Sequence, residues 1–62
     1  MSGSSDFLKE AARLRDMAHR ARRMGGQLSI ESDRQRLEAY AQELETEAAI
    51  WERRAAAEKA KE

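Results

Sequence analysis

The chain has 62 residues, no cysteine and no proline, and its 12 acidic and 12 basic side chains cancel to a net charge of zero. This length allows one small domain, and the lack of cysteine excludes disulfides, thiolate nucleophiles and thiolate zinc sites. The longest apolar run, Ala48 to Trp51, is too short to cross a membrane, and no signal peptide is recognisable. We therefore expect a soluble, cytoplasmic protein with one domain over residues 1–62.

The first predicted element is a helix over about residues 6–24, after a flexible leader over residues 1–5. Ser5 is a good N-cap residue for this helix. Apolar residues then recur at alternating steps of four and three, which is the seam of a heptad repeat: Phe7, Ala11, Leu14, Ala18 and Ala21. Gly25 and Gly26 are predicted to end the helix, because glycine accepts the left-handed conformation of a C-terminal cap.

A turn is predicted over about residues 25–31, followed by a second helix over about residues 32–60. Either Ser29 or Ser32 can serve as its N-cap. The same four-three spacing continues along this helix: Leu37, Ala41, Leu44, Ala48, Trp51 and Ala55. Residues 56–62 are strong helix formers with little to bury, so this end is expected to fray.

The two seams match when Phe7 and Leu37 are both assigned to heptad position d. Every a position is then alanine, while most d positions are large apolar residues. Alanine at a lets two antiparallel helices approach closely. The sequence therefore predicts an all-α protein, an antiparallel two-helix hairpin.

Opposite charges at the e positions favour the same pairing of the helices. Folding the chain at the glycines brings Arg22 near Glu38 and Arg15 near Glu45. Each exposed pair contributes about 0.2–1 kcal/mol, so these pairs select the register more than they stabilise it.

Further apolar residues lie beside the seam and form a predicted apolar strip together with Trp51 of the seam: Met17, Met24, Tyr40, Ile50 and Trp51. In a lone hairpin this strip either packs across the edge of the two helices or is left exposed to water. Only 13 apolar side chains are larger than alanine, so a single hairpin has little to bury. We expect the strip to be an interface of a homodimer, a two-fold four-helix bundle. The alternative partner is a helix of another protein.

The basic residues of the first helix are a candidate nucleic-acid contact. Arg13 and Arg20 share position c, and Lys9 and Arg23 share position f. A dimer would display these residues twice, and a doubled basic face can follow a phosphate backbone. However, the net charge is zero, the isoelectric point is near 6.6, and no exposed aromatic residue is interleaved for base stacking. A solvated helix face is the favoured interpretation.

No catalytic, cofactor-binding or metal-binding residues are predicted, and we do not expect an enzyme. Asp16 and His19 have the spacing of carboxylate–histidine pairs that bind iron inside helical bundles. In the heptad assignment, however, they fall on the outer face among arginines, which repel a cation. The glutamates of the second helix also lie among arginines on an open surface, where burial cannot tune a pKa.

Several short segments resemble small bacterial hairpin proteins of unknown function. They are Phe7-Leu8-x-x-Ala11, Arg22-Arg23-Met24, Ser29, Asp33-Arg34-Gln35-Arg36-Leu37, Tyr40-Ala41 and Trp51-Glu52. This chain has Glu31 where those proteins commonly have proline. In length and alanine/leucine layering the sequence is also similar to the Rop family. This second likeness, one of architecture alone, implies hairpins that pair into four-helix bundles and bind paired RNA loops.

Overall fold

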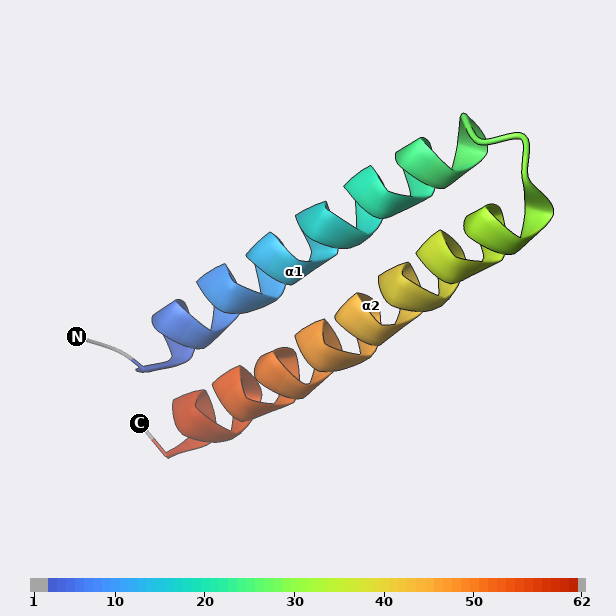
Figure 1. Cartoon of the computed structure of the whole chain (residues 1–62). Coiled ribbons are helices and arrows are strands. Elements are labelled where there is room, and N and C mark those ends of the chain that lie inside the picture. Colours follow the sequence, from blue (N-terminus) through green and yellow to red (C-terminus); the bar gives the residue numbers. More distant parts are fainter. Residues whose placement is uncertain (1–2, 62) are drawn as a thin grey trace.

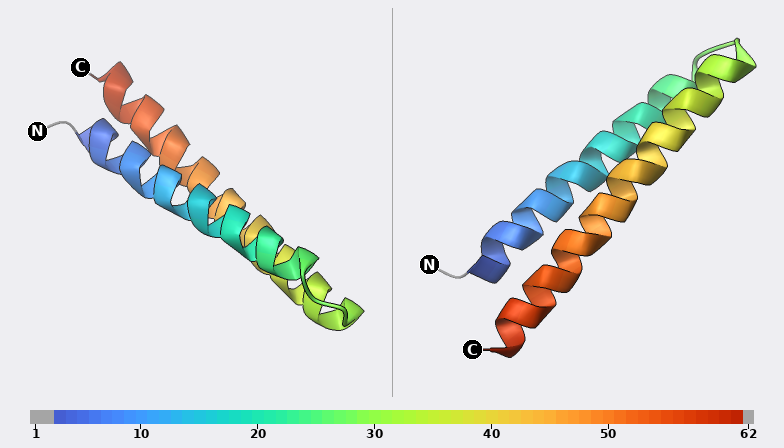
Figure 2. Two further views of the ribbon diagram at one scale, coloured as in Figure 1. Left: turned by 90° about the horizontal axis from the view of Figure 1, so that it is seen from above. Right: turned by 60° about the horizontal axis from the view of Figure 1, so that its bottom comes forward.

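The computed structural model describes residues 3–61, which form two α-helices, α1 (Gly3–Gly26) and α2 (Glu31–Ala60). The helices are antiparallel and lie side by side, with both chain ends at one end of the molecule and the turn at the other (Figures 1 and 2). The Cα atoms span 49 × 14 × 9 Å, so the molecule is a rod one helix pair wide. The predicted antiparallel hairpin is confirmed.

The core is a single row of small side chains between the two helices. The buried residues are Ala11, Leu14, Ala18, Ala21 and Gly25 in α1 and Ala41, Leu44, Ala48 and Ala55 in α2. All of them except Gly25, which was predicted to end the helix, fall at predicted a or d positions, and Ala18, Ala41 and Ala48 have no exposed surface. The heptad seam predicted from the spacing is therefore confirmed.

The end of α1 differs from the prediction. The helix continues through Gly25 and Gly26, and no residue from 3 to 61 has a positive φ, so the predicted left-handed cap is wrong. Gly25 instead extends the seam, because a Cβ there would lie 3.4 Å from the Cβ of Leu37. The turn covers residues 27–30 and begins with hydrogen bonds from the Gln27 N–H to the Met24 carbonyl (3.1 Å) and from the Leu28 N–H to the Gly25 carbonyl (3.2 Å).

The start of α2 also corrects the prediction, because neither serine caps the helix. The N-cap is Ile30, whose extended backbone (φ −89°, ψ 118°) leads into Glu31 without a side-chain cap. Its carbonyl accepts the Arg34 N–H at 3.0 Å. Glu31 and Asp33 lie in the first turn, where carboxylates interact favourably with the positive end of the helix dipole.

The open end of the hairpin is more regular than predicted. Helix α1 begins at Gly3, so residues 3–5 of the predicted leader are helical, and residues 1–2 lie outside the described range. A Cβ added at Gly3 would lie 3.6 Å from Glu58 Cγ, so the first turn of α1 lies beside the last turns of α2. Helix α2 continues to Ala60. Fraying of this end stays a prediction.

Candidate association surface

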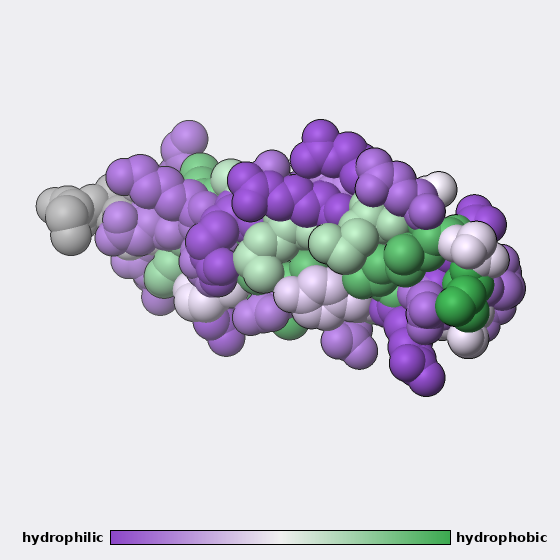
Figure 3. Space-filling view, turned by 45° about the horizontal axis from the view of Figure 1, so that its top comes forward, coloured by the Kyte–Doolittle hydropathy of each residue, from purple (hydrophilic) through white to green (hydrophobic). Residues whose placement is uncertain are grey.

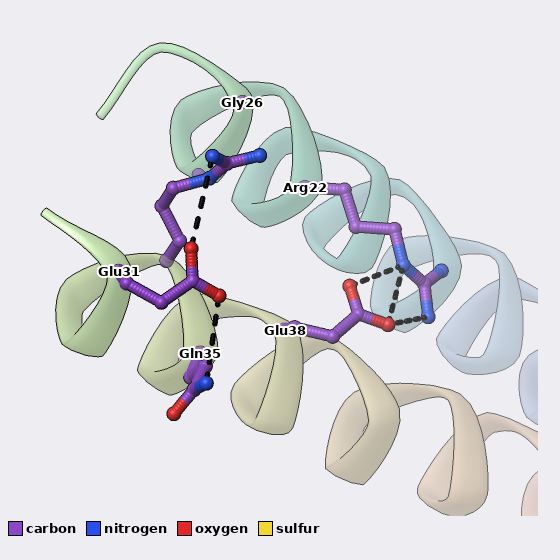
Figure 4. A pocket seen from close by; sticks show the side chains of 7 residues that line it. Arg22, Gly26, Glu31, Gln35 and Glu38 are labelled. Atoms are coloured by element: carbon purple, nitrogen blue, oxygen red, sulfur yellow. Dashed lines mark hydrogen bonds and ion pairs between the residues drawn. The ribbon is translucent and has the colours of Figure 1, made fainter. Parts of the chain in front are cut away.

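One edge of the hairpin, made by the e positions, is closed by ion pairs between the helices. We call this set the ionic edge: Arg15 and Arg22 of α1 with Glu38, Glu45 and Glu52 of α2. Arg22 donates two hydrogen bonds to Glu45, at 2.6 and 2.8 Å, and its Nε lies 3.0 Å from Glu38 Oε2. Figure 4 shows Arg22 and Glu38 facing each other near the turn. These bidentate, charge-assisted contacts fix the register of the two helices.

The predicted partners on this edge are partly right. Arg22–Glu38 is confirmed, but Arg15 donates to Glu52 (2.7 and 2.8 Å) rather than to Glu45, which Arg22 binds instead. Arg15 does lie close enough to Glu45 to interact with it electrostatically. Its hydrogen-bonded partner was missed because the prediction assigned each arginine one glutamate, whereas Arg22 binds two. Hydrogen bonds from the arginines lower the pKa of all three glutamates below their ordinary value of 4.5.

The opposite edge, made by the g positions, carries a shallow apolar groove near the turn. The groove is lined by Met17, Arg20, Ala21, Met24, Leu37 and Tyr40. Met24 is 56% exposed and Tyr40 45% exposed, although both are large apolar side chains. Figure 3 shows a face of the hairpin on which hydrophobic side chains form a band between hydrophilic ones. At about 210 Å³ the groove is below the ~300–1,000 Å³ of small-molecule sites, which favours a flat macromolecular contact.

The structure brings three of the five predicted strip residues together, namely Met17, Met24 and Tyr40. Ile50 lies elsewhere, in a separate hollow along α2 that includes Glu43 and Glu47.

Trp51 also lies away from the groove, at the open end of the hairpin. Its ring centroid is 5.4 Å from that of Phe7, and the Arg54 guanidinium lies 4.9 Å above it. Trp51 therefore packs within the hairpin.

Leu37 and Arg20 line the groove but were not assigned to it from the sequence. Leu37 is a seam residue that stays half-exposed, because Gly25 beside it has no side chain. The glycine at position a was the available signal, but it was interpreted as a helix end. Arg20 was assigned to the basic face, and its position at c also borders the groove.

The end of the groove away from the turn is bounded by a charged pair. Arg13 holds Glu10 with two hydrogen bonds, at 2.6 and 3.0 Å, and its Nη1 lies 3.1 Å from the sulfur of Met17. The pairing lowers the pKa of Glu10 below its ordinary value. The apolar part of this edge therefore covers the half of the hairpin nearest the turn.

The candidate nucleic-acid residues do not form a uniform basic patch. Arg13 is paired with Glu10, and Arg20 is paired with Asp16 at 3.0 Å. Lys9 and Arg23 are exposed on the outer face of α1. Because two of the four positive charges are balanced by carboxylates on the same helix, the field available to a phosphate backbone is reduced.

A further hollow lies at the turn, lined by side chains that already bind one another (Figure 4). Glu31 accepts a hydrogen bond from Gln35 at 3.4 Å and lies 3.8 Å from Arg34. Over residues 3–61, no three His, Cys, Asp or Glu side chains are grouped so that they could hold a metal ion. In the same range, neither helix combines the length and apolar content needed to cross a membrane.

No protein-family model, curated protein or solved structure matches this chain. The likeness to small bacterial hairpin proteins, and that to the Rop architecture, therefore stay predictions. The geometry of the two edges is the basis for a functional proposal.

Proposed function

We propose that the protein is a non-catalytic interaction module that forms a homodimer, with two hairpins packed through their apolar grooves into a four-helix bundle. The observation that carries this proposal is the exposed groove of Met17, Met24, Leu37 and Tyr40, which is bordered by charged side chains. Exposed apolar surface bordered by polar residues is typical of protein–protein contact sites. Methionine and tyrosine suit such contacts, because one is adaptable and the other amphipathic.

The small core of the hairpin supports the proposal. In the part of the chain that the structure describes, no side chain larger than leucine is buried, and most buried residues are alanine or glycine. Ordering each residue costs about 1–2 kcal/mol of backbone entropy, and domains of this size usually need an additional source of stability. With no cysteine available for disulfides, a second copy is the simplest source of further burial.

The difference between the two edges supports the choice of surface. The ionic edge already joins α1 to α2 through Arg15 and Arg22, so covering it would remove water from several charges. The apolar half of the groove edge has one charged lining residue, Arg20, which is paired with an aspartate of the same helix, so fewer charges lose water there. A second hairpin that covers Met24 and Tyr40 gains apolar contact without breaking an ion pair.

Sedimentation equilibrium from low micromolar to millimolar concentration tests the proposal. We expect a monomer–dimer equilibrium and a melting temperature that rises with protein concentration, because dimerisation stabilises the folded state. Met24→Glu should abolish the dimer, since it places a charge in the contact. Leu8→Glu is the matched control: Leu8 is 53% exposed but lies on the other edge, so the dimer should persist.

Two results would contradict the proposal. A wild-type chain that stays monomeric and folded at every concentration would show that the groove needs no cover. Equal loss of the dimer in Met24→Glu and Leu8→Glu would show that another surface is used. A monomeric, largely unfolded chain would instead favour a helix of a different protein as the partner.

A further inference from the structure

We infer that the two-fold axis of this dimer runs parallel to the helices. In that arrangement α1 of each copy lies on α2 of the other, and both turns lie at the same end. Arg20 of one copy then faces Glu43 of the second. This inference rests on the proposed function and specifies its geometry. Three observations lead to it: the dimensions of the hairpin, the position of the groove, and the charges beside the groove.

The dimensions require overlap along the full length of the hairpin. A face of 49 × 14 Å has a projected area on the order of 700 Å², close to the ~800 Å² per partner of a stable interface. A staggered dimer that overlaps only at the turn half would bury about half of this area, which is typical of weak contacts. Two hairpins stacked along their whole length therefore fit best.

The position of the groove then selects the direction of the axis. Met17, Met24 and Tyr40 lie in the half of the hairpin nearest the turn. An axis parallel to the helices keeps every residue at its own level, so the two grooves face each other. An axis perpendicular to the helices inverts the levels. With full overlap, it would place the groove against the polar half that contains Glu10 and Arg54.

The charges beside the groove fit the parallel axis. Gly25 is level with Leu37 in the hairpin, and Phe7 is level with Trp51, which places Glu43 level with residues 17–18. With the parallel axis, Glu43 of the second copy lies between the levels of Arg13 and Arg20. Arg20 is the closer, about 3–4.5 Å along the axis at a rise of ~1.5 Å per residue.

Glu43 is suited to this contact. It is exposed, and its carboxylate makes no ion pair or hydrogen bond with the other residues of the range 3–61. Arg20 lines the groove and binds Asp16 with one of its two terminal nitrogens, so further donors are available.

The perpendicular axis gives the opposite electrostatics. With full overlap it lays α2 on α2 of the second copy, inverted about the middle of the helix near residue 45. Glu47 of one copy then comes level with Leu44 of the other, next to its Glu43. Four glutamates would gather in one region, and like charges at close range disfavour the complex.

Charge reversal tests the contact. Arg20→Glu and Glu43→Arg should each raise the dimer dissociation constant on the order of 10-fold, because every dimer contains the pair twice. Mixing the two variants should restore wild-type affinity as a heterodimer, and the chain carrying both changes should restore it as a homodimer. Lys9→Glu, on the outer face of α1, should leave the dissociation constant unchanged.

A spin-label distance tests the axis without relying on the charges. The natural chain has no cysteine, so Lys59→Cys, exposed at the open end, gives one label per copy. With helix spacings of ~8–10 Å, the parallel axis places the two labels roughly 20–30 Å apart. The perpendicular axis places residue 59 of one copy level with residue 32 of the other, so the labels are about 40 Å apart along the helices at a rise of ~1.5 Å per residue.

The results separate this inference from the proposed function. A dimer with a long label distance, or with no change on Arg20→Glu and Glu43→Arg, overturns the geometry and leaves self-association standing. A chain that never dimerises overturns the proposed function itself. A short label distance together with rescue in the mixed variants supports both.

Discussion

Replacing Gly26 with alanine is expected to stabilise the hairpin by about 0.4–1 kcal/mol, because alanine loses less backbone freedom on folding than glycine does. The structure accommodates the change. Gly26 lies within α1 with a negative φ, and an added Cβ would meet no other atom within 4 Å. For a domain of this size, the gain corresponds to a rise in melting temperature of about 2–8 °C.

Gly25→Ala provides the comparison, because it has the same gain in helix propensity but a different environment. The added Cβ would lie 3.4 Å from the Cβ of Leu37 and 3.8 Å from the carbonyl oxygen of Arg34. This contact is tight, so the two helices must separate slightly near the turn to accept it. Such overpacking costs on the order of 1 kcal/mol, and the net effect of Gly25→Ala should be close to zero.

Thermal and urea unfolding, followed by circular dichroism at one fixed protein concentration, measure both variants. The fixed concentration matters because the proposed dimerisation would shift the melting temperature. If Gly26→Ala destabilises the protein by about 1 kcal/mol or more, Gly26 adopts the left-handed conformation in solution and our account of the helix end is wrong. If Gly25→Ala stabilises as much as Gly26→Ala, Gly25 is not in a close contact.

Two further predictions concern the seam and the ionic edge. Ala48→Leu should lower the free energy of unfolding, measured in urea, by about 1–3 kcal/mol, because Ala48 is completely buried. Ala39→Leu, on the exposed outer face of α2, should change this free energy little. Equal effects would show that the register is wrong. The glutamates of the ionic edge have lowered pKa values, so their contribution to stability is complete above the ordinary value of 4.5 and is lost as the pH falls below it. The melting temperature should therefore fall as the pH is lowered below 4.5, and Arg22→Gln should make this fall smaller. An unchanged pH profile in Arg22→Gln would show that the ion pairs of the ionic edge do not cause the pH dependence.

The seam could be predicted from the sequence because its spacing depends only on helix geometry. Residues such as Leu14 and Leu44 recur with the period that places them on one face, and the structure buries them there. The ionic edge was only partly predictable. The heptad places Arg15 and Arg22 on the right edge, but their partners depend on side-chain reach, which spacing does not specify.

The turn and the groove show why other details could not be predicted. Gly25 has two physical roles open to it, a left-handed cap or a close approach between helices, and the choice depends on contact with the second helix. Ser29 and Ser32 have good capping chemistry, but the path of the chain places Ile30 at the N-cap. Ile50 lies near the predicted strip on a helical wheel, yet the structure places it in a separate hollow.

The contrast between the two long edges has a consequence for the size of any assembly. In the dimer proposed above, both apolar grooves are buried between the two copies. The edge that faces outward carries the ion pairs of Arg15 and Arg22. A third hairpin could bind there only by removing water from those charges. The desolvation free energy would exceed what the ion pairs gain from being buried. If the proposed dimer forms, growth should therefore end at two copies, and the same charges that align the helices would disfavour open-ended filaments.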